Sequence, residues 1–339
     1  MKRNRVIALF LILCMMISLA GCANPIRMVK NLFGDDEQAA STIIENVSDD
    51  QGDVQLRDTV LYYKDDKGFL IPVMRKIPWT EGIAKSTLAS LVDNPINRQD
   101  MESIGLIPVI PANTQIHGMN IENGLCKVDF STDILNYASK DEEESLVRAV
   151  VYTLTEFVTI DRVQFLIDGK VQKKLPFGTE VSKPITRDNI NYVGVEPSKD
   201  KVVVYYEGTT NGLETYFVPV TKAITKNDEL GVNVIDALDA LVEGPPEGLG
   251  LYTQIPKGTK VISVDVNNAI AYVNFNEEIL KIKDSEETAD HVLKSIALTL
   301  KEQYRDVAAV KILANGKEVE IGTAKDEEPV AVPTFANQH

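Results

Sequence analysis

Alternating apolar and polar residues mark two β-hairpins in this chain. Residues 116–130 alternate on either side of Asn123-Gly124, a two-residue turn that hairpins favour because both residues tolerate a positive φ. Residues 261–275 show the same alternation around Asn267-Asn268-Ala269. The pattern therefore predicts one hairpin in each of these segments.

The two hairpins belong to a longer internal repeat. The block IPANTQIHGMNIENGLCKVDFSTDIL (110–135) and the block IPKGTKVISVDVNNAIAYVNFNEEIL (255–280) are identical at eight of 26 positions without a gap. Further partners occur in the same order in both copies, 146 to 150 residues apart: LASLVDNP with LDALVEGP, YTLTEF with LTLKEQ, and LIDGKV with LANGKE. We therefore predict two tandem homologous domains, residues 59–185 and 199–324, each long enough to bury its own core.

Each copy begins with two extended segments. The first segment holds a tyrosine pair, Tyr62-Tyr63 or Tyr205-Tyr206, and the second holds Pro72 or Pro219. Because proline has no backbone N–H for the strand ladder, the second segments are expected at the edge of a sheet.

Apolar residues at helical spacing predict two helices in each copy. The first helix ends at Asn94-Pro95 in copy one and at Gly244-Pro245-Pro246 in copy two. The stripes of the second helix are Val147, Val150, Val151, Leu154 and Val158, and Leu293, Ile296, Ala297, Leu300 and Tyr304. The repeated order of helix, strand, strand, helix and strand predicts an α+β fold. In it a small, mainly antiparallel sheet carries two helices on one face.

The N-terminus reads as a targeting segment. Residues 1–21 combine the basic start MKRNR with a short apolar run and the ending Leu-Ala-Gly before Cys22, which is typical of a secretory signal. The ending LAGC resembles a bacterial lipobox, which implies a lipid on Cys22 and an anchor on the extracytoplasmic side of the cell membrane. Residues 22–58 are expected to be an acidic flexible spacer, and residues 325–339 a disordered tail.

Charge and cysteine content narrow the class of protein. The formal net charge is −15, and it becomes −18 when Lys2, Arg3 and Arg5 leave with the signal. This balance argues against nucleic acid as a partner and against binding an anionic membrane by charge alone. After processing and lipidation, Cys126 is the only free thiol, so no intramolecular disulfide is possible. Cys126 aligns with Ala271, which predicts a buried, small apolar role.

No constellation for catalysis, cofactor binding or metal binding stands out. His117, His291 and His339 are the three histidines, and none occurs in both copies. H-E-x-x-H, G-x-S-x-G and phosphate-loop motifs are missing. The acidic run 141–144 is read as the first turn of a helix, where negative charge offsets the dipole, rather than as a calcium site. We expect no enzyme, although two carboxylates across a cleft could still make a glycosidase.

Aromatic residues supply the candidate partner contacts. In a strand, one tyrosine of each pair should face the core and one should face outward. Tyr62, Tyr205 and Trp79, the only tryptophan, are therefore candidate contacts with a protein partner. The alternative is that all three serve packing alone.

The LAGC ending, the pairs LVDNP and LVEGP, IPANTQI and IPKGTKV, and the doubled hairpin block together resemble the GerMN domain family over residues 59–324. The resemblance implies a role in sporulation or spore germination at the envelope, with no established catalytic residues. It also implies a core similar to the ring-building modules of secretion-system scaffolds. We therefore expect a lipid-anchored assembly factor of a complex that spans the envelope between mother cell and forespore, with sporulation membrane proteins as partners. A peptidoglycan-acting enzyme and a germinant-binding lipoprotein are the alternatives.

Overall fold

The computed structural model describes residues 55–194, 200–210, 212, 214–224, 233–319, 321 and 328–339. The predicted signal peptide, Cys22 and the spacer up to residue 54 lie outside the described residues. The first strand begins at Leu56, three residues before the predicted start of the first domain.

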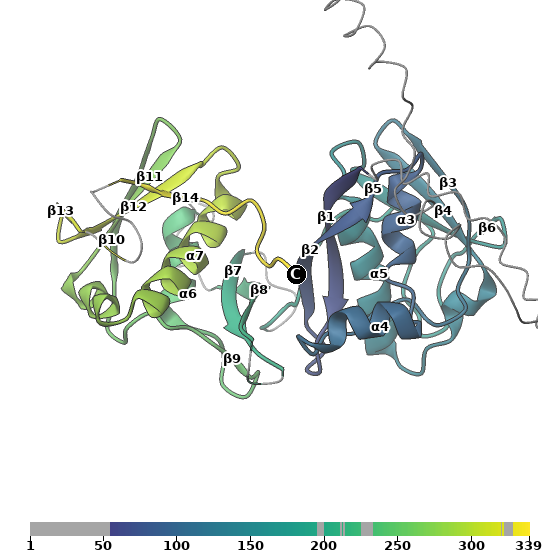
Figure 1. The fold of residues 1–339 in the computed structure, drawn as a ribbon, viewed down its shortest axis with the longest axis horizontal. Helices are drawn as coiled ribbons and strands as arrows, with labels where there is room; N and C mark the ends of the chain where they lie inside the picture. Colours follow the sequence, from purple (N-terminus) through teal and green to yellow (C-terminus); the bar gives the residue numbers. More distant parts are fainter. Residues whose placement is uncertain are drawn as a thin grey trace, which may run out of the picture. The chain divides into compact units, whose positions relative to one another are not determined.

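The first domain contains two sheets and three α-helices (Figure 1). Strands β1 (Leu56–Lys64) and β2 (Leu70–Pro78) form a hairpin, followed by α3 (Ile83–Ala89) and α4 (Pro95–Glu102). The second sheet has the order β3-β4-β5-β6. Its strands and helices are β3 (Ile116–Glu122), β4 (Leu125–Phe130), η2 (Thr132–Leu135), α5 (Lys140–Leu154), β5 (Arg162–Ile167) and β6 (Lys170–Val171).

The second domain repeats this plan (Figure 1). Its first sheet has the order β8-β7-β9 and its second the order β10-β11-β12-β13, with β14 also paired to β12. The elements are β7 (Lys201–Gly208), β8 (Tyr216–Ala223), α6 (Val234–Glu243), β9 (Leu251–Tyr252), β10 (Val261–Asn267), β11 (Ile270–Phe275), η3 (Glu277–Asp284), α7 (Glu286–Gln303), β12 (Ala309–Ala314), β13 (Lys317–Glu318) and β14 (Val330–Ala331).

The predicted order of helix, strand, strand, helix and strand is confirmed in both domains. The predicted hairpins are β3–β4 and β10–β11, and their turns carry positive φ at Asn123 and Gly124 and at Asn268 and Ala269. The second sheet of each domain also contains one parallel pair, β4–β5 or β11–β12. These pairs are parallel because a long helix, α5 or α7, carries the chain back across the sheet between the two strands.

Buried residues occupy equivalent positions in the two domains. Cys126 and Ala271 are both 0% exposed and face partners at equivalent positions, Val163 and Val310, on the neighbouring strand. The predicted apolar role of Cys126 is confirmed, and burial raises the pKa of its thiol to about 12. In both domains the predicted helical stripe runs past the end of the helix. α5 ends at Leu154 and Val158 is 94% exposed, while α7 ends at Gln303 and Tyr304 is 42% exposed.

Two elements differ from the sequence prediction. α3 ends at Ala89, before the predicted stop at Asn94-Pro95. Asn94-Pro95 instead starts α4, because the Asn94 side chain accepts hydrogen bonds from the Ile96 and Asn97 N–H groups and proline suits the first helical position. The predicted disorder of the tail is wrong for residues 328–339. Val330 and Ala331 pair with β12, because the outer edge of β12 offers unpaired backbone groups that this segment satisfies.

Candidate interaction surface

Tyr62 and Tyr205 are buried, so the prediction that they face outward is wrong. Tyr62 is 4% exposed and packs among Leu70, Ala149, Tyr152 and Ile190. Tyr205 is 7% exposed and has an equivalent apolar environment. Because side chains alternate along a strand, Tyr62 and Tyr205 point away from the main core of their domains. Residues of α5 and α7 pack on that side of the strand as well, so neither tyrosine reaches the surface.

The two buried hydroxyls have matching partners. Tyr62 donates to Glu156 Oε1 at 3.0 Å, and Tyr205 donates to Glu302 Oε1 at 3.1 Å. The backbone N–H of each tyrosine donates to a threonine hydroxyl of the long helix at 3.1 Å, Thr153 or Thr299. Burial raises the pKa of both tyrosines well above the ordinary value. These contacts fasten the first hairpin of each domain to its long helix, which is a structural role.

Two asparagine side chains join the first hairpins of the two domains. Leu70 N–H donates to Asn191 Oδ1 at 2.8 Å, and Asn191 Nδ2 donates to the carbonyls of Leu70 and Pro219 at 2.9 and 2.8 Å. Asn337 makes the same three bonds at equivalent positions, from Phe217 N–H and to the carbonyls of Phe217 and Pro72, at 2.8, 2.9 and 2.8 Å. We call Asn191 and Asn337 with these backbone groups the asparagine clasp.

The clasp explains the prolines at the predicted edge positions. The N–H groups of Leu70 and Met74 both bond away from β1, to Asn191 Oδ1 and to the Asn337 carbonyl. Pro72 lies between them, where another residue would place an unpaired N–H. Asparagine amides therefore connect two strands that cannot pair directly at this point.

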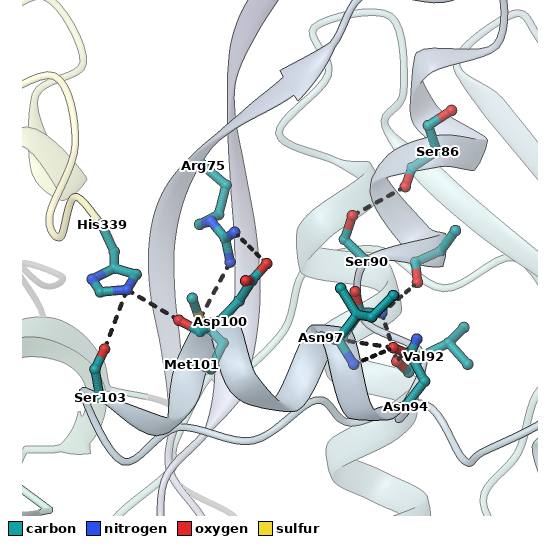
Figure 2. A network of polar contacts seen from close by, with 12 residues as sticks. Arg75, Ser86, Ser90, Val92, Asn94, Asn97, Asp100, Met101, Ser103 and His339 are labelled. Carbon is teal, nitrogen blue, oxygen red and sulfur yellow. Dashed lines mark hydrogen bonds and ion pairs between the residues drawn. The ribbon is translucent and has the colours of Figure 1, made fainter. Parts of the chain in front are cut away.

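His339 fixes the segment that follows β14 to the first domain. Figure 2 shows the His339 imidazole beside α4, where its Nε2 lies 3.0 Å from the Asp100 carbonyl and 3.4 Å from Ser103 Oγ. Arg75 of β2 pairs with the Asp100 carboxylate at 2.9 Å in the same region. The segment predicted to be disordered is thus part of the junction between the domains.

Trp79, the third candidate contact, is 53% exposed. Trp79 follows β2, and its backbone N–H donates to the Gln55 carbonyl at 2.6 Å. The Arg57 guanidinium carbon lies 5.5 Å from the Trp79 ring centre and 5.6 Å from the Phe157 ring centre. Arg57, Trp79, Phe157 and the exposed Val158 form what we call the Arg57–Trp79 patch.

The patch occurs in the first domain alone among the described residues. The residues equivalent to Arg57, Phe157 and Val158 are Asp200, Gln303 and Tyr304. The sequence prediction missed Arg57 because its ring partner Phe157 lies 100 residues away, beyond any local pattern. The sequence does carry one sign of this site: at these positions the two copies of the repeat have different residues.

The two described non-terminal histidines lie in separate polar groups. His117 Nε2 is 3.3 Å from Asp168 Oδ1 in the first domain. His291 Nδ1 is 2.8 Å from Glu207 Oε2 in the second, beside Gln254. Within the described ranges, no three His, Cys, Asp or Glu side chains are grouped to hold a metal ion. The same ranges contain no helix that is both long and apolar enough to span a membrane.

The acidic run 141–144 opens α5, as predicted. Ser139 caps the helix, and Asp141, Glu142 and Glu143 lie in its first turn. Glu143 is the exception within the run because it is 0% exposed. It accepts hydrogen bonds from Phe177 N–H, Thr179 N–H and Tyr137 Oη at 2.7, 2.9 and 2.9 Å, which fixes the loop after β6 to the helix.

Comparisons with known proteins agree with this architecture. The family model described as "Germane: Sporulation and spore germination" matches residues 60–173 and 203–320. The chain is 32% identical over 290 residues to the spore germination protein GerM of Bacillus subtilis (strain 168), covering 82% of this chain and 77% of that protein. The solved tandem GerMN domains of B. subtilis GerM match with a TM-score of 0.72 and 31% identity, over 84% of this chain and 99% of that one. The resemblance and the fold class predicted from the sequence are confirmed.

Proposed function

Because this chain belongs to the Germane family of sporulation and spore germination proteins, we propose that it is a non-catalytic assembly factor. In this proposal it is anchored by lipid at Cys22 on the extracytoplasmic side of the cell membrane. It acts in a complex that spans the envelope between mother cell and forespore, and its partners are sporulation membrane proteins.

The Arg57–Trp79 patch carries the proposal. Its tryptophan is more than half exposed, and Val158 beside Phe157 is almost fully exposed. Tryptophan and arginine are the residue types that most often dominate the energy of protein interfaces. A structural role alone does not account for an exposed tryptophan next to an arginine, so a partner protein is the best explanation.

The chemistry of the described residues favours binding over catalysis. The His117 and His291 groups lie in different domains, and the Cys126 thiol is buried with a pKa of about 12. A thiol with so high a pKa is not a nucleophile at neutral pH. These observations support a protein that acts by contact.

Substitution of the patch tests this function. Trp79→Ala should lower the yield of heat-resistant spores while the amount of protein and its melting temperature stay close to wild type, because an exposed side chain contributes little to stability. Tyr304→Ala, at the position equivalent to Val158, is the matched control and should behave as wild type. Normal sporulation in both variants would show that the patch is not the working surface.

The lipid anchor has its own test. Cys22→Ser should move the protein from the membrane fraction to the soluble fraction, because stable attachment of an acidic protein needs acyl chains. Cys126→Ser keeps the proposed lipidation site and should remain with the membrane. Membrane association of Cys22→Ser would contradict the anchor.

A further inference from the structure

Arg57 contacts aromatic rings rather than an acidic side chain among the described residues. Within the described parts of the chain, its guanidinium makes two ring contacts and no ion pair. The arginines that do pair with carboxylates are Arg75, Arg98, Arg148 and Arg187. Arg162 and Arg305 also lack an ion pair among the described residues, so Arg57 is distinguished by its two ring contacts.

The ring contacts prepare Arg57 to bind a carboxylate. Contact with an aromatic face involves the plane of the guanidinium, while its N–H donors point outward within that plane. Those donors match the two oxygens of a carboxylate in a bidentate pair. Because Trp79 and Phe157 restrain the side chain, less rotamer entropy is lost when an anion binds.

The surroundings of Arg57 also suit an apolar group. Trp79, against which Arg57 lies, is 53% exposed, and Val158, which follows Phe157 in the chain, is 94% exposed. We propose that the Arg57–Trp79 patch receives a segment of a partner protein that places an Asp or Glu carboxylate on Arg57 and an apolar side chain against Trp79 and Val158. This inference rests on the proposed function and names the chemistry of its partner.

Charge complementarity favours this occupant over the others. A protein with net charge −15 repels an anionic bilayer, and a single arginine is a weak counterweight. A second copy of the chain would meet the same repulsion over its whole surface. A short acidic and apolar segment meets Arg57 without bringing a large charged surface close.

Photocrosslinking in sporulating cells tests the occupant directly. A benzoylphenylalanine at position 158 of the full chain should crosslink to a partner protein, within a few residues of an Asp or Glu in the mapped peptide. The same probe at position 304 is the matched control and should give no such product. Crosslinks to lipid, to a second copy or to residues 22–54 of the same chain would each overturn the proposal.

Variants of Arg57 separate charge from geometry. Arg57→Gln should reduce the crosslink yield about tenfold or more, because it removes a charge-assisted pair at an interface. Arg57→Lys should give an intermediate yield, since a lysine keeps the charge but loses the planar fork. Lys85→Gln removes an exposed charge elsewhere in the domain and should leave the yield unchanged. The melting temperature of each variant checks that folding is intact.

The results distinguish the two proposals. A yield that does not depend on Arg57 would overturn the carboxylate inference while a crosslinked sporulation protein would still support assembly. If position 158 gives no protein product and Trp79→Ala sporulates normally, both proposals fail. Restoration of crosslinking when Arg57→Glu is combined with a lysine in place of the mapped acid would establish the pair.

Discussion

Glu143 shows how a single buried charge can stabilise the first domain. Burial alone would raise the pKa of its carboxyl, but hydrogen bonds from Thr179, Phe177 and Tyr137 outweigh burial and hold the pKa below the ordinary value. A carboxylate with a lowered pKa stabilises the folded state at neutral pH, and this contribution is lost as pH falls through the folded-state pKa.

We therefore predict that Glu143→Gln lowers the free energy of unfolding by about 1–3 kcal/mol at neutral pH, because its amide NH2 cannot accept all of these bonds. The variant should also lose less stability than wild type when the pH is lowered from about 7 to about 3. Urea unfolding across this range measures both effects. Glu144→Gln removes a half-exposed acid and should change stability by less than about 0.5 kcal/mol. An equal acid dependence in wild type and Glu143→Gln would refute the assignment.

The second residue-scale prediction concerns the two equivalent hairpin turns. Ala269 holds a φ of 62°, whereas its counterpart in the first domain is Gly124 with a φ of 74°. A non-glycine residue in this region costs roughly 1–2 kcal/mol, partly offset because alanine restricts the unfolded chain. Ala269→Gly should therefore stabilise the protein by about 0.5 kcal/mol.

Gly124→Ala should have the opposite effect and cost about 1–2 kcal/mol. A Cβ at this position would also collide with Asp161 Oδ2, so the aspartate must move. Thermal unfolding of the two variants beside wild type measures the difference. The same sign of change in both would contradict the left-handed turn geometry.

At the scale of elements, the start of α4 gives the clearest test. Asn94 Oδ1 accepts from the N–H groups of Ile96 and Asn97, both at 3.0 Å. Asn94→Ala leaves these donors unsatisfied and should cost about 1 kcal/mol, while Asn94→Asp should keep most of the stability. Chemical denaturation of both variants measures the cap. If alanine and aspartate behave alike, the side chain does not cap the helix.

The elements also show which features a sequence can predict. Periodicity located the hairpins, the long helices and the edge prolines, because alternation and turn residues are local. It could not locate the layer over Tyr62, since Tyr152 and Ile190 come from distant segments. Arg57 was missed for the same reason. The tail has no periodicity of its own, and its order depends on β12 and β2, which supply the partners of Val330 and Asn337.

For the whole molecule, the asparagine clasp suggests what the duplication contributes. Each domain ends in a segment with an asparagine that binds the first hairpin of both domains. Asn191 follows the first domain and Asn337 follows the second, and each bonds to β2 and to β8 at equivalent positions. Two copies of one sequence can therefore provide both halves of a self-complementary contact, as in a symmetric dimer.

Hydrogen exchange at two backbone amides, Leu70 and Phe217, can test the two halves of the clasp separately. In Asn337→Ala, the Phe217 N–H loses its acceptor, so its hydrogen exchange should accelerate while that of Leu70, bound to Asn191, changes less. Asn191→Ala should reverse this pattern. Each variant should also lose about 1–3 kcal/mol of stability, because buried backbone groups are left unsatisfied.

Gln338→Ala, next to the clasp, is the control and should leave both amides as in wild type. If Asn337→Ala exchanged like wild type at Phe217, the tail would not join the domains in solution, and the contact that links the two copies would have to be sought elsewhere.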